Sequence, residues 1–227
     1  TSAVIVNCMD GKYPNTNLTG VGVVYKFLEQ YELDLAHDLT HLDSLLPLVT
    51  LGQLADLADV RNLETRGLCL QGLEDFAENN LLLKAIVEEQ EYSMKGECNF
   101  TTISWYVAPL MNAIFRQGTL EDRIDLFKAI CNFEEERVHV PQRKTKDNPN
   151  KEPIVESLQK NIIRRAKSIK SHQDNEVKKE VKEIQNMVDE TDKVIIVDIT
   201  GIVSPGHSGL IANRLAHQYK RPVILVN

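Results

Sequence analysis

The chain has 227 residues, of which 42% are hydrophobic and 26% are charged, and its formal net charge is −7. This balance is typical of a globular protein and excludes a disordered tail, a collagen-like fibre and a disulfide-stapled miniprotein. No apolar run approaches the roughly 20 residues that span a bilayer, and residues 1–7 lack the basic start of a signal peptide.

The charges are unevenly spread along the chain. Residues 1–143 contain 11 Lys and Arg against 22 Asp and Glu, a net charge of −11, whereas residues 144–227 contain 15 against 11, a net charge of +4. An acidic half could hold cations and a basic half could meet phosphate, although solvated surface explains the same asymmetry. The four cysteines include no C-x-x-C pair, so we expect neither zinc nor disulfides but reduced thiols in a cytoplasmic protein.

The first part of the chain is predicted to be mainly helical. Residues 3–6 predict a short buried strand, and a loop over residues 7–18 leads into a helical pattern through Tyr25 and Leu28. Nearly continuous apolar residues from 42 to 60 predict a buried helix, with Pro47 near its start. Further helices are predicted at about residues 64–77, 80–92, 101–116 and 119–137.

The last third changes character. Residues 140–153 are rich in Pro, Lys and Asn, which predicts a linker or surface loop. A long charged helix is predicted over about residues 154–188, and its thin apolar stripe is typical of a helix that bridges two bodies. A strand at 193–198, a helix at 209–219 and a strand at 222–226 predict one α/β unit with parallel pairing. We therefore expect an α/β protein in two bodies, the second of them incomplete because about 35 residues are too few for a stable domain.

Two places in the first body could carry chemistry. Asp56 stands inside an apolar stretch, where a carboxylate has to be paired, hydrogen-bonded or bound to a metal. An ion pair with Arg61 or Arg66 at a helix end is the alternative without a chemical role. Asn112 and Arg116 share one helix face, where an arginine can clamp a phosphate and an asparagine can hydrogen-bond beside it. An ordinary surface pair would have the same spacing.

The third place is the turn Gly206-His207-Ser208-Gly209, which opens a helix after a strand. Free backbone N–H groups at such a turn can bind an anion, and His207 could hydrogen-bond a phosphate oxygen. A plain strand-to-helix turn with His207 in solvent is the alternative. The turn lacks the lysine and the spacing of a P-loop, so that motif is excluded.

Two further features are weaker candidates for a functional site. The first is a group of two histidines and two aspartates that could bind a metal: His37, His41, Asp38 and Asp43. A solvated helix start explains that group equally well. The second is the pair Trp105 and Tyr106, which could stack on bases, although such a pair more often packs in a core.

Four segments, in chain order, resemble RecJ-type single-strand-specific exonucleases of the DHH phosphoesterase superfamily, and divergent phage-like members most of all. Residues 7–23 resemble the segment after the DHH motif, and residues 51–56 (L-G-Q-L-A-D) resemble the family's fourth motif. Residues 109–116 (P-L-M-N-A-I-F-R) are similar to its P-R-L-N-A-A-G-R segment, and residues 209–223 resemble the start of the DHH-associated domain. The resemblance covers nearly the whole chain.

The resemblance implies a domain plan and an activity. Residues 1–140 would be the C-terminal part of a DHH domain, residues 141–190 a linker and long connecting helix, and residues 191–227 part of a DHH-associated domain. The parent enzyme would cut single-stranded DNA from the 5′ end, with two Mn²⁺ or Mg²⁺ ions activating water and holding the scissile phosphate.

The resemblance also implies roles for single residues. Asp56 matches the family's bridging metal ligand and would be catalytic. Asn112 and Arg116 match residues beside the cleft, where Arg116 would meet the DNA phosphate. In the family, one face of the DHH-associated domain binds the DNA strand. The residues that match this face are His207, Ser208, Gly209, Asn213 and Arg214.

The sequence also departs from the family. The family's Asp-rich and Asp-His-His motifs would come before residue 1 and its G-G-G-H motif after residue 227, Cys8 replaces a usual proline, and His207 is offset from the family's usual histidine. One carboxylate cannot hold two divalent ions against hydration, so we expect this chain to be an incomplete portion that is inactive alone. Two alternatives are a DHH-family phosphodiesterase of short oligonucleotides or cyclic dinucleotides, and a non-catalytic DNA-binding or replication scaffold.

Overall fold

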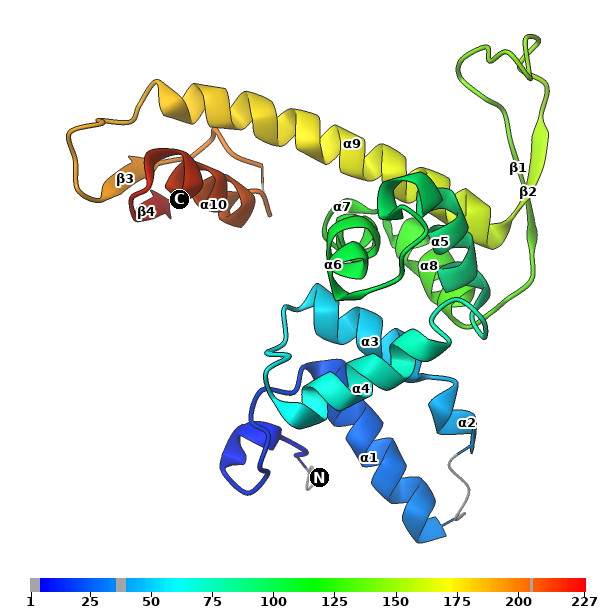
Figure 1. Cartoon of the computed structure of the whole chain (residues 1–227). Helices are drawn as coiled ribbons and strands as arrows, with labels where there is room; N and C mark the ends of the chain where they lie inside the picture. Colours follow the sequence, from blue (N-terminus) through cyan, green and yellow to red (C-terminus); the bar gives the residue numbers. More distant parts are fainter. Residues whose placement is uncertain (1–4, 36–39, 205) are drawn as a thin grey trace, which may run out of the picture.

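The computed structural model describes residues 5–35, 40–204 and 206–227 (Figure 1). An N-terminal body contains η1 (Cys8–Asp10), α1 (Gly20–Leu35), α2 (Thr40–Asp43), α3 (Leu46–Ala55) and α4 (Leu63–Glu74). A central body contains α5 (Leu81–Met94), α6 (Phe100–Thr102), η2 (Ile103–Val107), α7 (Ala108–Gln117) and α8 (Leu120–Ile130). The chain continues through β1 (Glu136–His139), β2 (Ile154–Ser157), α9 (Leu158–Gln185), β3 (Ile195–Asp198), α10 (Ser208–Tyr219) and β4 (Val223–Val226).

Helix α3 joins the N-terminal body to the central body because it is buried on two sides. Leu46 and Val49 pack in the N-terminal core, whereas Leu51 and Leu54 pack in the central core. Pro47 lies in the first turn of α3, where its missing N–H costs no helical hydrogen bond. The predicted buried helix is therefore confirmed, although it has 10 residues and does not fill the whole apolar run.

Helix α9 connects the central body to a C-terminal lobe, which is formed by β3, α10 and β4 (Figure 1). The thin apolar stripe of α9 predicts this bridging position. It has 28 residues and is therefore about 42 Å long. Its first turns bury Ile162 and Ala166 in the central core, and its last turns bury Val181 and Ile184 in the core of the lobe. One continuous helix thus fixes the two cores relative to each other.

An ion network fastens the first half of α9 to the central body. The guanidinium of Arg165 contacts the carboxylates of Asp122 and Asp125 on α8. Arg137 of β1 lies 3.0 Å from Asp125 Oδ1. The side chains of Asp122 and Asp125 are only 9% and 5% exposed, so each carboxylate depends on these partners.

The C-terminal lobe has the strand, helix, strand order that its sequence predicts. β3 and β4 pair in parallel, with Ile195 opposite Val223. Ile211 and Leu215 of α10 pack in the same core as Ile195. The combination of a helix-rich body with this small parallel sheet confirms the α/β class.

A β-hairpin corrects two of the predicted helices. The helix predicted at 119–137 ends at Ile130, and the long helix begins at Leu158, because β1 and β2 pair antiparallel between them. The Ser157 hydroxyl accepts a hydrogen bond from the Lys160 N–H at 3.3 Å and so caps α9. Both strands are largely exposed, and they therefore lack the alternation of polar and apolar residues that marks a strand in sequence.

The predicted strand at residues 3–6 lies partly outside the described residues. Ile5 and Val6 are described, are exposed and lie in no strand. Within the described ranges, no helix combines the length and the apolar character needed to cross a membrane.

Candidate nucleic-acid interface

A pocket of about 600 Å³ lies where the helical bodies meet α9 and α10. Its walls come from the end of α3, from η2 and α7, from the middle of α9 and from α10, so segments far apart in sequence contribute to it. The polar residues that line it are Ser104, Asn112, Arg116, Lys170 and Gln173. The apolar wall includes Leu54, Leu57, Trp105 and Leu210.

The sequence-predicted pair on α7 lies in this pocket. Asn112 and Arg116 both line it, as residues one helical turn apart should. Arg116 is exposed. The arginines that form ion pairs among the described residues are Arg61, Arg137, Arg164 and Arg165. The charge of Arg116 is therefore free to meet an anionic ligand.

Two further polar residues of the pocket come from α9, and sequence reasoning missed them. Lys170 lines the pocket while its ammonium contacts Asp174 one turn further on. Gln173 is only 3% exposed, and its Nε2 has no hydrogen-bond partner in the described part of the chain. The sequence does contain a signal for Gln173. It is a polar residue that lies between Ile169 and Val177, at a position where the apolar stripe of the helix would have an apolar one.

Trp105 is an exposed part of the pocket wall. It belongs to the π-helical segment η2, in which Ile103 and Val107 are fully buried while Trp105 is 72% exposed. Its side chain also lines a second hollow of about 270 Å³ together with Leu57. The expectation that Trp105 packs in a core is therefore wrong, and π-helical turns of this kind occur often at functional sites.

Asp56 caps the C-terminal end of α3 and is exposed. The residues on either side of it, Ala55 and Leu57, line the pocket, so Asp56 stands next to the pocket wall. Its alternative partner Arg61 lies 2.8 Å from Asp59 instead. Within the described ranges, Asp56 forms no ion pair with any arginine. Because Asp56 is exposed, water can solvate its carboxylate, so the apolar surroundings expected from the sequence are corrected and no partner is required.

His207 connects three elements at the mouth of the C-terminal lobe. Its side chain has no exposed surface, its Nδ1 lies 2.7 Å from Glu180 Oε2 on α9, and its Nε2 contacts the amide nitrogen of Gln117 at the end of α7. The Ser204 N–H donates to Glu180 Oε1 at 2.9 Å. Burial raises the pKa of Glu180, but the hydrogen bonds from Ser204 and His207 outweigh burial and leave that pKa below its ordinary value.

The position of His207 differs from both sequence expectations. The ring is buried, so His207 does not point into solvent. Both ring nitrogens already have protein partners, so His207 is not placed to hydrogen-bond a phosphate oxygen in this arrangement. Its contacts instead join the turn before α10 to the helix that carries Arg116.

The other predicted residues of the lobe lie on the surface of α10. Ser208, Gly209, Asn213 and Arg214 are exposed, and only their neighbour Leu210 is among the residues that line the pocket. Ile211 and Leu215 are buried on the opposite side of the helix. The described structure therefore leaves these four residues open to a ligand without placing them in the pocket itself.

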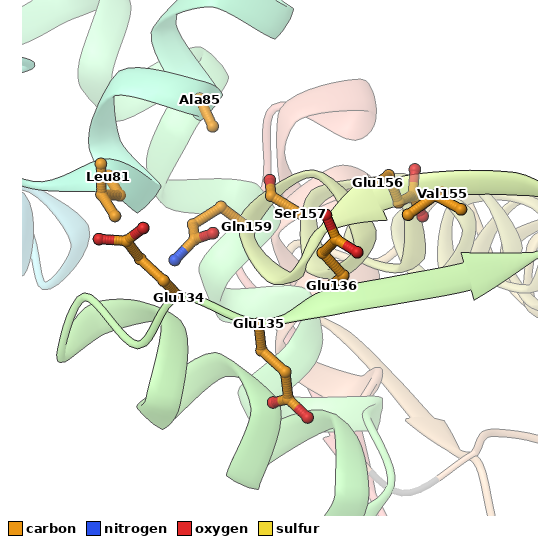
Figure 2. Close-up of a pocket in the computed structure, with 9 residues that line it drawn as sticks. All are labelled: Leu81, Ala85, Glu134, Glu135, Glu136, Val155, Glu156, Ser157 and Gln159. Atoms are coloured by element: carbon orange, nitrogen blue, oxygen red, sulfur yellow. The ribbon is translucent and has the colours of Figure 1, made fainter.

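A second pocket, of about 490 Å³, is acidic and lies at the base of the hairpin. Figure 2 shows its carboxylates pointing in different directions, with Glu134 toward Leu81 and Glu135 away from it. Glu135 and Glu156 are ion-paired with Arg137 and Arg164, whereas Glu134 and Glu136 have no ion-pair partner among the described residues. In the part of the chain that the structure describes, no group of three or more His, Cys, Asp and Glu side chains could hold a metal ion. His37 and Asp38 lie outside that part, and His41 pairs with Glu32 at 3.2 Å.

Comparison with known proteins tests the resemblance. The chain is 34% identical over 226 residues to YorK of the SPbeta prophage in Bacillus subtilis (strain 168), a protein that carries the provisional name single-strand DNA-specific exonuclease. It is 29% identical over 217 residues to the single-stranded-DNA-specific exonuclease RecJ of Bacillus subtilis (strain 168). The resemblance to RecJ-type exonucleases is confirmed. No family model matches the chain.

The relatives are much longer than the chain. The similarity to YorK covers 98% of the chain and 38% of YorK, and the similarity to RecJ covers 94% of the chain and 24% of RecJ. Among solved structures, an exonuclease RecJ bound to manganese matches 96% of the chain and 49% of its own length, with a TM-score of 0.69 and 18% identity. RecJ of Thermus thermophilus in complex with Mg²⁺ matches 96% of the chain and 30% of its own length, with a TM-score of 0.68 and 19% identity. The chain therefore has the fold of a part of RecJ.

Proposed function

We propose that the protein acts on single-stranded DNA as part of a metal-dependent 5′–3′ exonuclease of the RecJ type. The observation that carries the proposal is the position of Asn112 and Arg116, which the sequence matched to a RecJ segment and which line the pocket where α7, α9 and α10 meet. An exposed guanidinium beside an amide suits a phosphodiester, because both groups donate to phosphate oxygens. The similarity to two proteins named as single-strand-specific exonucleases supports the same substrate.

The described residues do not by themselves fit two divalent ions. Mn²⁺ and Mg²⁺ prefer about six ligands, mainly oxygen, whereas Asp56 offers one exposed carboxylate and belongs to no group of three candidate ligands among those residues. What the pocket offers is binding and orientation of the strand. The proposal includes Asp56 as one metal ligand. It also includes a domain plan: a part of a DHH domain at residues 1–140, a connector at 141–190 and a part of a DHH-associated domain at 191–227.

The proposal is tested with the longest protein encoded by the reading frame that contains these residues, beside the 227-residue chain. With Mn²⁺, the longer protein should release mononucleotides from the 5′ end of a labelled single strand, and the chain alone should bind the strand without cutting it. Asp56→Asn should lower turnover by at least about a hundredfold while leaving affinity for the strand within about threefold.

Asp59→Asn is the matched control, because Asp59 lies three residues further on and is paired with Arg61. It should leave turnover within about twofold. Equal turnover of Asp56→Asn and the unaltered protein would remove Asp56 from the reaction. Faster hydrolysis of a dinucleotide than of a long strand would indicate a short-oligonucleotide phosphodiesterase, and strand binding without any cleavage would indicate a DNA-binding scaffold.

A further inference from the structure

We propose that the pocket between η2, α7 and α9 holds one nucleotide of the strand, with its base stacked on Trp105 and with Gln173 donating a hydrogen bond to it. The inference rests on the proposed function, because it states how the same pocket holds a single strand. It assigns a base-binding role to two residues, one on η2 and one on α9.

The exposure of Trp105 is the first observation. The indole of Trp105 is 72% exposed and lines the pocket, so it offers a large apolar face to whatever the pocket holds. Leu57, which is 84% exposed, lines the same two hollows as Trp105 and extends the apolar surface. A nucleobase stacks on such a surface whatever its sequence, since every base has a π-face.

The orphaned amide of Gln173 is the second and independent observation. Gln173 lines the pocket, and its Nε2 is buried without a hydrogen-bond partner in the described residues. A buried donor without a partner is costly, and at a pocket wall a ligand can supply the missing acceptor. Base carbonyls, ring nitrogens and phosphate oxygens are acceptors of this kind.

The positively charged side chains of the pocket favour an anionic ligand. Arg116 and Lys170 line the same space as Trp105 and Gln173. A ligand that offers an aromatic face, a hydrogen-bond acceptor and a negative charge satisfies all four residues, and a nucleotide has these three features together.

The sequence contains one tryptophan, so tryptophan fluorescence reports on this site alone. The 227-residue chain is titrated with a thymidine oligonucleotide and with an abasic strand of the same length, and binding is followed in parallel by anisotropy of a label on the strand. The oligonucleotide should quench Trp105 and the abasic strand should not. The abasic strand should also bind at least about fivefold more weakly.

Two variants separate binding from folding. Trp105→Ala should weaken strand binding about tenfold or more, while Tyr92→Ala, which removes an aromatic ring that is 98% exposed on α5, should not. Gln173→Leu should weaken binding several-fold and yet leave the melting temperature unchanged or raised, because it removes an unsatisfied buried donor. A residue with a merely structural role would not produce that combination.

Three results would overturn the inference. Strand binding without a change in tryptophan emission, and equal binding by Trp105→Ala, would leave the proposed function intact and place the bases elsewhere. An emission that shifts with protein concentration in the absence of DNA would mean that a second copy covers Trp105. Absence of any strand binding would overturn both this inference and the proposed role of the pocket.

Discussion

Glu180 and His207 hold the C-terminal lobe against the central body through a small number of buried polar atoms. Glu180 accepts from the Ser204 N–H and lies 2.7 Å from His207, while His207 contacts Gln117, the residue directly after Arg116. The position of the arginine in the pocket is thus linked to the turn before α10. Because these groups are buried, each depends on its partners for hydrogen bonds.

The charge of Glu180 should make the contact between the lobes dependent on pH. Its pKa is lowered in the folded protein, so its contribution to stability is present above the unfolded pKa and is lost as the pH falls through the folded pKa. Glu180→Gln should lower the free energy of unfolding by about 1–2 kcal/mol near pH 7, and the difference should shrink as the pH falls below the ordinary pKa of a glutamate carboxyl. Urea unfolding across this range measures the difference.

Glu183→Gln is the control for this measurement, because Glu183 is exposed on the same helix. It should change the free energy of unfolding by less than about 0.5 kcal/mol at either pH. A Glu180→Gln penalty that stays constant from neutral to acidic pH would mean that the contact does not depend on the carboxylate charge.

At the scale of whole elements, one glycine sets how closely α3 and α4 approach. A Cβ at Gly72 would lie 2.2 Å from Thr50 Oγ1 and 2.3 Å from the Leu46 carbonyl oxygen. The backbone of α3 leaves no room for that atom, so the close packing of the two helices requires glycine here. The end of α3 carries Asp56, and this packing therefore helps to fix the wall of the pocket.

Two alanine substitutions in α4 should have opposite effects. Gly72→Ala should lower the free energy of unfolding by about 1–3 kcal/mol because it forces α3 away. Gly67→Ala should raise it by about 0.5–1 kcal/mol, because a Cβ there meets nothing within 4 Å and alanine favours the helix. Thermal and urea unfolding of both variants test the pair, and equal effects at the two positions would contradict the packing argument.

The elements differ in how well sequence alone predicts them. The regular spacing of apolar residues predicted α9 as a bridging helix and β3 and β4 as a parallel pair. These predictions are confirmed because the burial of each element follows one regular pattern. The hairpin was missed, since its strands are exposed and its three consecutive glutamates suggest a helix. Trp105 was expected in a core because composition does not reveal a π-helical turn.

In the candidate site, too, local sequence patterns predict some residues and miss others. The i, i+4 spacing placed Asn112 and Arg116 on one face in advance. The partners of His207 and the isolation of Gln173 depend on contacts across 90 residues and between helices, and no local pattern contains that information.

At the scale of the whole molecule, the distribution of charge should orient the single strand that we propose as ligand. The chain carries a net charge of −7, and the acidic pocket at the hairpin should repel a strand. The pocket at α7 and α9 presents Arg116 instead, together with Lys170, whose ammonium contacts Asp174. A single strand should therefore bind on the side where the C-terminal lobe faces α7 rather than in the acidic pocket at the base of the hairpin.

The salt dependence of strand binding tests this account most directly. Each phosphate contact adds about 0.7 to the slope of log affinity against log salt concentration for a single strand. Arg116→Ala should weaken binding and reduce that slope by about 0.7, whereas Arg123→Ala, an exposed arginine on α8 that does not line the pocket, should leave the slope unchanged. An Arg116→Ala variant with the affinity and slope of the unaltered chain would contradict the central claim that this pocket holds the phosphate backbone of a single strand.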